Sequence, residues 1–206
     1  VLLELGTECL GVYTGESRGE EGSNVLGYAR FRLGDGEPSN LIELVRQPGD
    51  RMFDLQGRWV LPGLVGVHNH LHLPGAPVLG ETATRLYLAA GDTTIHTAGS
   101  ADAEAELALA KAIEDGESHG PRLLASAPYV TGPGGNGPMD KPASADEARA
   151  FVDHWADRGV HGFKLYRHVQ PDVAAAIVDA AKARRRTVSA HLCSLTYAEA
   201  SRLGVD

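Results

Sequence analysis

Cysteine is scarce in this sequence: the 206 residues include only Cys9 and Cys193, which form no C-x-x-C pair. Two such cysteines indicate no disulfide framework and are compatible with a reducing compartment. No signal peptide is visible in the sequence, and no apolar run is long enough for a transmembrane helix. It begins at Val1 rather than methionine, which leaves the natural N-terminus open. We expect a cytoplasmic protein without a membrane partner.

Positive charge is also in short supply. The sequence has 19 Lys and Arg against 27 Asp and Glu, a formal net charge of −8. This balance argues against a nucleic-acid partner, which would require a basic surface. Hydrophobic residues make up 43% of the chain, which is ample for a packed core. We therefore expect a globular protein that acts on a small-molecule substrate, with homo-oligomerisation as an open possibility.

The first 58 residues differ from the rest of the chain in composition and in hydrophobic pattern. They are rich in glycine and acidic residues, and turn sequences separate short β-like runs. The clearest of these runs are residues 25–33, 41–46 and 51–55. The pattern predicts a small β-domain over residues 1–58.

From residue 59 onward the pattern alternates between strands and helices. The predicted strands are 60–69, 93–97, 122–130, 162–166 and 187–192. The predicted helices are 82–90, 101–116, 144–158, 171–186 and 196–203. Five β/α repeats indicate an α/β fold with a parallel sheet, either an open doubly wound sheet or a closed eight-stranded (β/α)8 TIM-type barrel. Because the chain stops where a sixth strand is expected, we interpret residues 59–206 as the first part of such a fold.

Two histidines stand at the end of the first of these strands. His68 and His70 are two residues apart, so their side chains point to the same face of the strand. At the carboxyl end of a barrel strand that face lines the active site, and neutral imidazole is a good ligand for zinc. Exposed histidines at a polar strand end are the alternative, but the apolar run behind a Pro-Gly turn favours ligands. His72 continues the alternation past the strand end, where we expect a loop or outer position.

Two further strands each carry a residue suited to the same site. His191 ends a short apolar strand, where a buried, hydrogen-bonded histidine is the alternative to a ligand. Lys164 lies in the middle of a predicted parallel strand, where burial of a charged amine is costly unless the amine is paired or neutralised. A neutral amine can react with carbon dioxide to give a carbamate, an anionic oxygen ligand that bridges two metals. A catalytic Schiff-base lysine is the rival interpretation.

These motifs resemble the amidohydrolase superfamily, and within it the imidazolonepropionase and Xaa-Pro dipeptidase-like group. The resemblance covers residues 54–206, and the Pro-Gly…His-x-His segment at 62–70 is its most specific part. Segment 54–63 is similar to the family's passage from a β-sandwich to the first barrel strand. Segments 91–95 and 120–122 resemble the second and third strands, and 159–166 resembles the strand with a carboxylated lysine. The resemblance implies a partial β-sandwich at 1–58 and the first part of a metal-dependent hydrolase barrel at 59–206.

The resemblance also implies a binuclear metal centre, with two zinc ions expected. His68 and His70 would hold one metal, carboxylated Lys164 would bridge the pair, and His191 would bind the second. A further histidine and the general-base aspartate of the family would lie beyond Asp206. The implied activity is hydrolysis of a C–N bond in a cyclic amide, a dipeptide or a related small molecule by metal-activated water.

The sequence departs from the family pattern at three positions. Gly66 stands where the family often has aspartate, and His96 stands where it often has arginine. Asn136 occupies the place of a histidine in the glycine-rich stretch after the third strand. We take His96, Asn136 and Tyr166, which shares a strand face with Lys164, as candidate substrate-binding residues. Two alternatives remain: a superfamily deaminase with one metal and no bridging lysine, and an inactive relative that serves as a scaffold.

Overall fold

The computed structural model describes residues 62–73, 75, 78–135, 137 and 139–206, together with the backbone of three strands within the first 32 residues. The chain divides into two units, Val1–Gly63 and Leu64–Asp206. In the first unit, β1 (Leu2–Leu5), β2 (Glu8–Glu16) and β3 (Asn24–Arg32) form an antiparallel sheet in that order. Here β3 matches the strand predicted at 25–33, whereas those at 41–46 and 51–55 lie outside the described residues. The β-sandwich stays a prediction.

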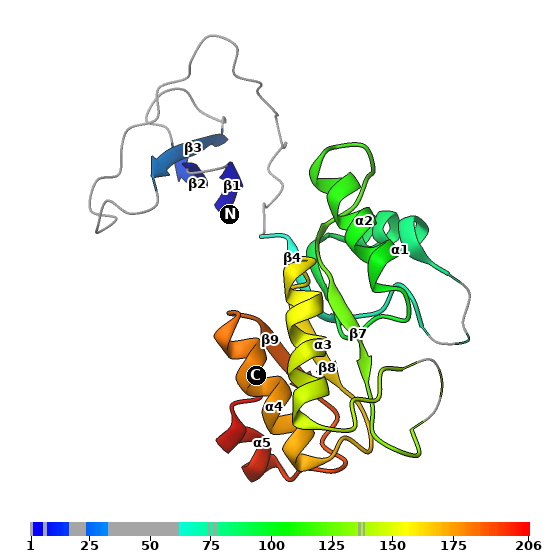
Figure 1. Cartoon of the computed structure of the whole chain (residues 1–206). Coiled ribbons are helices and arrows are strands. Elements are labelled where there is room, and N and C mark those ends of the chain that lie inside the picture. Colours follow the sequence, from blue (N-terminus) through cyan, green and yellow to red (C-terminus); the bar gives the residue numbers. More distant parts are fainter. Residues whose placement is uncertain are drawn as a thin grey trace. The chain divides into compact units, whose positions relative to one another are not determined.

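The second unit alternates strands and helices, as the sequence predicts (Figure 1). Its strands are β4 (Leu64–Asn69), β5 (Asp92–Thr97), β6 (Arg122–Leu124), β7 (Ser126–Val130), β8 (Gly162–Leu165) and β9 (Thr187–Ala190). Its helices are α1 (Gly80–Ala90), α2 (Ala103–Glu114), α3 (Ala145–Asp157), α4 (Pro171–Ala183) and α5 (Tyr197–Leu203). None of the helices in the described part of the chain is long and apolar enough to span a membrane.

All strand pairs of this unit are parallel and join neighbours in the chain. β4 pairs with β5 and β5 with β6, while β7 pairs with β8 and β8 with β9. A single residue, Ala125, separates β6 from β7, so the run predicted at 122–130 is interrupted, and its two parts belong to two three-stranded sheets, β4-β5-β6 and β7-β8-β9. A doubly wound sheet reverses its strand order at a switch point. The described strands show no reversal, which agrees with part of a (β/α) barrel.

The local sequence explains where the helices begin and end. Ser144 caps α3 by accepting a hydrogen bond from the Glu147 N–H, and Pro171 opens α4 at a position where its missing N–H costs nothing. Gly91 ends α1 in the left-handed conformation, with φ of 100°. The prediction that α4 extends to residue 186 was wrong by three residues, because its last regular residue is Ala183.

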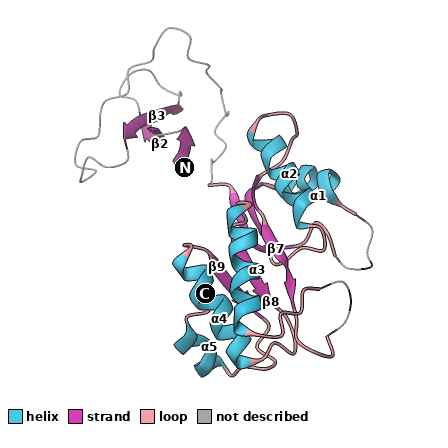
Figure 2. Cartoon of the chain, viewed as in Figure 1, coloured by secondary structure: helices cyan, strands magenta, loops and turns pink. Residues whose placement is uncertain are grey.

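The main core lies between the strands and helices α3 and α4. Helices α3, α4 and α5 lie side by side next to β9 (Figure 2). Phe163 and Leu165 of β8 point into this core and are at most 2% exposed. Because successive side chains of a strand point to opposite faces, Lys164 between them points to the other face of the sheet. The packing of Phe163 and Leu165 against the helices therefore places the Lys164 side chain on the opposite face of the sheet.

The loops after β7 and β8 meet at Gly132, whose N–H donates to the Arg167 carbonyl at 3.1 Å. A Cβ atom at this position would overlap the carbonyl oxygen of His168, a backbone atom that cannot turn away. We expect Gly132→Ala to lower the free energy of unfolding by roughly 2–3 kcal/mol, as measured by urea denaturation of the full-length protein.

Gly120→Ala is the matched control for this substitution, because a Cβ there meets the end of the Ile113 side chain, 2.7 Å from Cδ1, and the Thr84 side chain. Side chains shift more easily than backbone, so we expect Gly120→Ala to cost less than half as much. Equal losses for the two variants would contradict the close approach of the loops at Gly132.

Candidate active site

The end of β4 presents two imidazoles on one side. The rings of His68 and His70 contact each other edge to face, with centroids 5.2 Å apart. His68 is exposed and His70 is half-buried. Partial burial lowers the pKa of both histidines, and the charge of Lys164 lowers each further. A backbone contact at Gly99 opposes this decrease for His70. Both rings are therefore biased toward the neutral form, in which imidazole binds metals.

Lys164 is the buried amine of the site. Its side chain is 3% exposed, and burial lowers the pKa of its amine. It forms no hydrogen bond or ion pair with any residue that the structure describes. A buried amine without an anionic partner is costly, so it is biased toward the neutral, nucleophilic form.

His191 approaches the same region from β9. It lies one residue past the end of the strand, rather than inside it as predicted, and its N–H donates to the Leu165 carbonyl at 2.9 Å. Partial burial lowers the pKa of this histidine, followed by the charges of Lys164 and His68. The structure thus brings all four predicted ligands within electrostatic range of one another.

Tyr129 of β7 is a residue of this site that the sequence analysis missed. Its hydroxyl lies 2.8 Å from Nδ1 of His70, and its ring is 3% exposed. Burial raises the pKa of the phenol to about 12, so the hydroxyl keeps its proton at neutral pH. The Tyr129 ring also contacts Tyr166, with centroids 6.2 Å apart, and Tyr166 contacts His191 at 4.6 Å. The two tyrosines therefore connect the histidines of β4 to the histidine after β9.

The three predicted substrate-binding residues have different outcomes. Tyr166 lies in this series of rings, and its hydroxyl accepts a hydrogen bond from Arg167 at 3.1 Å. His96 contacts Ser126 and His161: its Nε2 is 3.1 Å from the Ser126 hydroxyl, and its ring centroid is 5.2 Å from that of His161. Burial and the charge of His161 lower the pKa of His96, and the charges of His68 and Lys164 lower it further. Asn136 lies outside the described residues.

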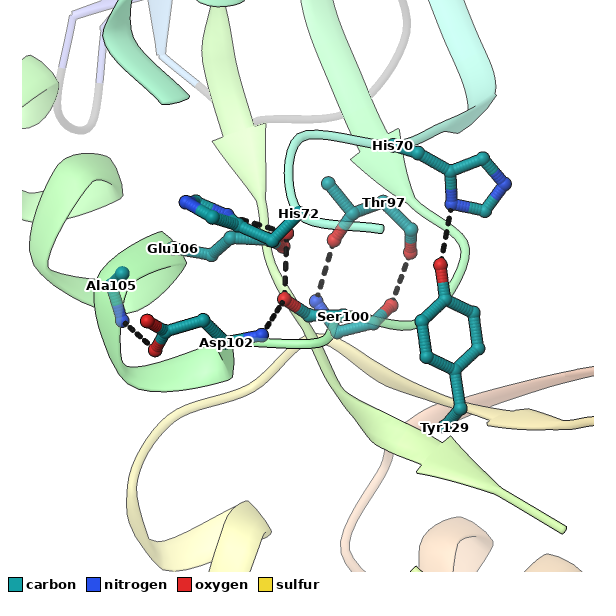
Figure 3. A network of polar contacts seen from close by, with 9 residues as sticks. His70, His72, Thr97, Ser100, Asp102, Ala105, Glu106 and Tyr129 are labelled. Carbon is teal, nitrogen blue, oxygen red and sulfur yellow. Dashed lines mark hydrogen bonds and ion pairs between the residues drawn. The ribbon is translucent and has the colours of Figure 1, made fainter. Parts of the chain in front are cut away.

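A buried polar network adjoins the site, where the loop after β4 meets α2. Figure 3 shows the side chains of His72 and Ser100 directed at the Glu106 carboxylate, with Nδ1 of His72 3.2 Å and the Ser100 hydroxyl 2.7 Å from Oε1. Glu106 is fully buried and His72 is 6% exposed. Burial raises the pKa of Glu106, and the hydrogen bond from Ser100 opposes this increase. His72 is thus a structural residue beside the site, in the outer position expected from the sequence.

The side chains of His68, His70, His191 and Lys164 are of the chemical types that bind a divalent metal. Three imidazoles with lowered pKa values lie near a buried amine that lacks an anionic partner. Among the residues that the structure describes, however, no three His, Cys, Asp or Glu side chains are close enough to hold a metal ion. A carboxylated Lys164 would add the anionic oxygens that the imidazoles lack. The residues therefore fit a metal centre in kind, while the ligand set still needs an anionic member.

Comparisons with known proteins support the fold and a local sequence relationship. No family profile matches the sequence. A dihydroorotase from Anaeromyxobacter sp. (strain K) is 37% identical over 76 residues, which are 35% of this chain and 18% of that protein. A dihydroorotase from Anaeromyxobacter dehalogenans is 39% identical over 64 residues, 30% of this chain and 15% of that protein. The matched segments are therefore less than a fifth of these curated relatives.

Solved structures share the fold over longer stretches. An amidohydrolase crystal structure superposes with a TM-score of 0.62 at 20% identity, covering 78% of this chain and 50% of that one. An uncharacterised protein gives a TM-score of 0.64 at 21% identity, with coverages of 95% and 59%. Bottromycin amidohydrolase gives 0.57 at 24% identity, with coverages of 69% and 31%. The chain thus covers between 31% and 59% of these structures.

Proposed function

We propose that the protein is a member of the amidohydrolase superfamily and a metal-dependent hydrolase of a C–N bond in a small molecule, in view of its fold neighbours and its local similarity to dihydroorotases. The observation that carries the proposal is Lys164. It is a buried amine without a partner among the described residues, and it has metal-binding residue types on two other strands within electrostatic range. A methionine would fill the same buried space without the cost of burying an amine, so the presence of a lysine at this position favours a chemical role.

In this proposal His68 and His70 would hold one divalent metal, His191 would hold a second, and a carboxylated Lys164 would supply the anionic ligand. Zinc is the expected metal in view of the nitrogen ligands. When bound, the metal pair supplies a water of lowered pKa and polarises the scissile carbonyl. The additional ligands and the general-base aspartate would come from further strands that close the barrel.

The chain's own residues would prepare the site for this chemistry. The lowered pKa values of His68 and His191 keep their imidazoles neutral at pH 7, so metal binding does not require the release of a proton from either ring. Tyr166, which contacts His191 and lies next to the strand of Lys164, is placed to contact a bound substrate. We retain His96 and Asn136 as further candidates. A cyclic amide, a dipeptide or a related molecule fits the proposal, and the names of the curated relatives favour the cyclic amide.

Metal analysis of the full-length protein tests the proposal. We expect close to two divalent metal ions per chain after gentle purification, with hydrolysis of a cyclic amide such as a dihydropyrimidine lost on chelation and restored by zinc. The measurement is elemental analysis together with a hydrolysis assay. One metal per chain would favour the deaminase alternative, and a protein purified gently without any bound metal would contradict the proposal.

A further inference from the structure

The contact between Tyr129 and His70 has a consequence for the protonation of the His70 ring. The hydroxyl oxygen of Tyr129 lies 2.8 Å from Nδ1 of His70, a normal hydrogen-bond distance. A neutral imidazole carries its proton on one nitrogen, and only the other nitrogen can bind a metal. We propose that Tyr129 is a positioning residue that accepts the Nδ1–H of His70 and so leaves Nε2 unprotonated, as the nitrogen that would bind a metal. This inference rests on the proposed metal-dependent function.

The packing around Tyr129 fixes the position of its hydroxyl. Tyr129 pairs with Lys164 in the β7–β8 register, so its ring stands next to the buried amine on the same face of the sheet. The backbone of Gly99 lies against the ring, and a Cβ atom there would be only 2.5 Å from Cδ1 of Tyr129. Gly99 has φ of 86°, which favours glycine at this position. A ring confined in this way holds its hydroxyl in place without rotamer freedom to lose on metal binding.

The arrangement leaves the hydroxyl proton of Tyr129 available to a second acceptor. An imidazole Nδ1–H that donates to the phenolic oxygen occupies a lone pair, while the phenol remains a donor. Partners of this kind orient metal-ligating histidines and select their tautomer, and removing one costs about 10–100-fold in metal affinity. Tyr166 provides a contrast, because its hydroxyl accepts from Arg167 and its ring is the part that contacts His191.

The first test needs no metal. In full-length protein stripped of metal and labelled with ¹⁵N-histidine, the His70 ring, assigned through a His70→Asn variant, should show the Nδ1–H tautomer. Tyr129→Phe should shift it toward a mixture of tautomers, whereas Tyr166→Phe should leave it unchanged. The phenylalanine ring preserves the packing on Gly99. A wild-type ring protonated at Nε2, for example toward the Gly99 backbone, would overturn the proposal without any variant.

The second test measures zinc affinity by chelator competition. Tyr129→Phe should weaken zinc binding about 10–100-fold, and Tyr166→Phe should stay within about twofold of the wild type. Equal affinities for Tyr129→Phe and the wild type would overturn the positioning role while leaving the hydrolase proposal intact. Failure of the wild-type protein itself to bind zinc would instead remove the proposed function on which this inference depends.

Discussion

Replacing Lys164 by alanine in the full-length protein should abolish hydrolysis and remove most of the bound metal. The amine is 3% exposed, has no partner among the described residues and lies near histidines of two other strands. If it carries the carbamate that bridges the metals, its loss removes the anionic member of the ligand set. We expect the loss of activity to exceed about 100-fold, since removing a residue one contact removed from a metal already costs about 10–100-fold. Elemental analysis and steady-state kinetics measure the two effects.

The packing of the lysine stem can be separated from its chemistry. Lys164→Met keeps an apolar chain of similar length, so it should lose metal as Lys164→Ala does. In metal-free protein, however, Lys164→Met should be as stable as the wild type or more stable, because it removes a buried amine without a partner. Thermal unfolding of the two metal-free proteins measures this. Lys111→Ala, at an exposed lysine of α2, is the control and should change neither metal content nor activity.

Chemical rescue distinguishes a metal ligand from a Schiff-base lysine. Short carboxylic acids offer the oxygen pair that the carbamate would supply, so they should restore part of the metal content and activity of Lys164→Ala. They offer nothing to a mechanism that needs a covalent amine. Unchanged metal content in Lys164→Ala would remove this residue from the metal site, whatever happens to activity.

The sequence was sufficient to predict the residues that depend on strict alternation. His68 and His70 are two positions apart, His68 within β4 and His70 just after its last residue, and their rings lie together as alternation predicts. Lys164 was predicted in the middle of a parallel strand, and the structure places it there, on the face opposite to the core that Phe163 and Leu165 fill. His191 was found one position past its strand, which changes the strand boundary but not the direction of approach.

Tyr129 could not be predicted in the same way. The pairing of β7 with β8 shifts register between Ser126 and Tyr129. Ser126 contacts His96 across the sheet, and strict alternation from Ser126 would place Pro128 and Val130 on that face rather than Tyr129. An irregularity of one residue therefore reverses the face of every side chain that follows. No local pattern in a five-residue strand reveals such a shift, because it is set by the pairing with the neighbouring strand.

The burial of Glu106 could have been predicted from its place on the apolar face of α2. In α2 the side of the helix toward the core carries Ala103, Glu106, Ala110 and Ile113, at the three- and four-residue spacing of one helix face. A glutamate in that series predicts a buried acid with a partner. The partner itself was beyond reach, because His72 lies 34 residues earlier in the chain and meets Glu106 only in the folded protein.

The Glu106 network should make one of the largest contributions to stability in the described part of the chain. The carboxylate accepts hydrogen bonds from Ser100 and His72, and it is fully buried. Glu106→Ala leaves both donors without their acceptor, at roughly 1–3 kcal/mol each, and adds a cavity. We therefore expect the free energy of unfolding to fall by about 3–5 kcal/mol in urea denaturation of the full-length protein.

A graded series makes this expectation specific to the carboxylate. Glu106→Gln keeps the shape and one acceptor oxygen, so it should cost about 1–2 kcal/mol. Glu114→Ala, at an exposed glutamate in the last turn of the same helix, should stay within about 0.5 kcal/mol of the wild type. Equal losses for Glu106→Ala and Glu114→Ala would mean that the network adds nothing to folding. A decrease in the loss of stability from Glu106→Ala through Glu106→Gln to Glu114→Ala would instead show that the Glu106 carboxylate holds the loop after β4 to α2. Because this loop follows His68 and His70, the geometry of the site would then depend on a residue outside it.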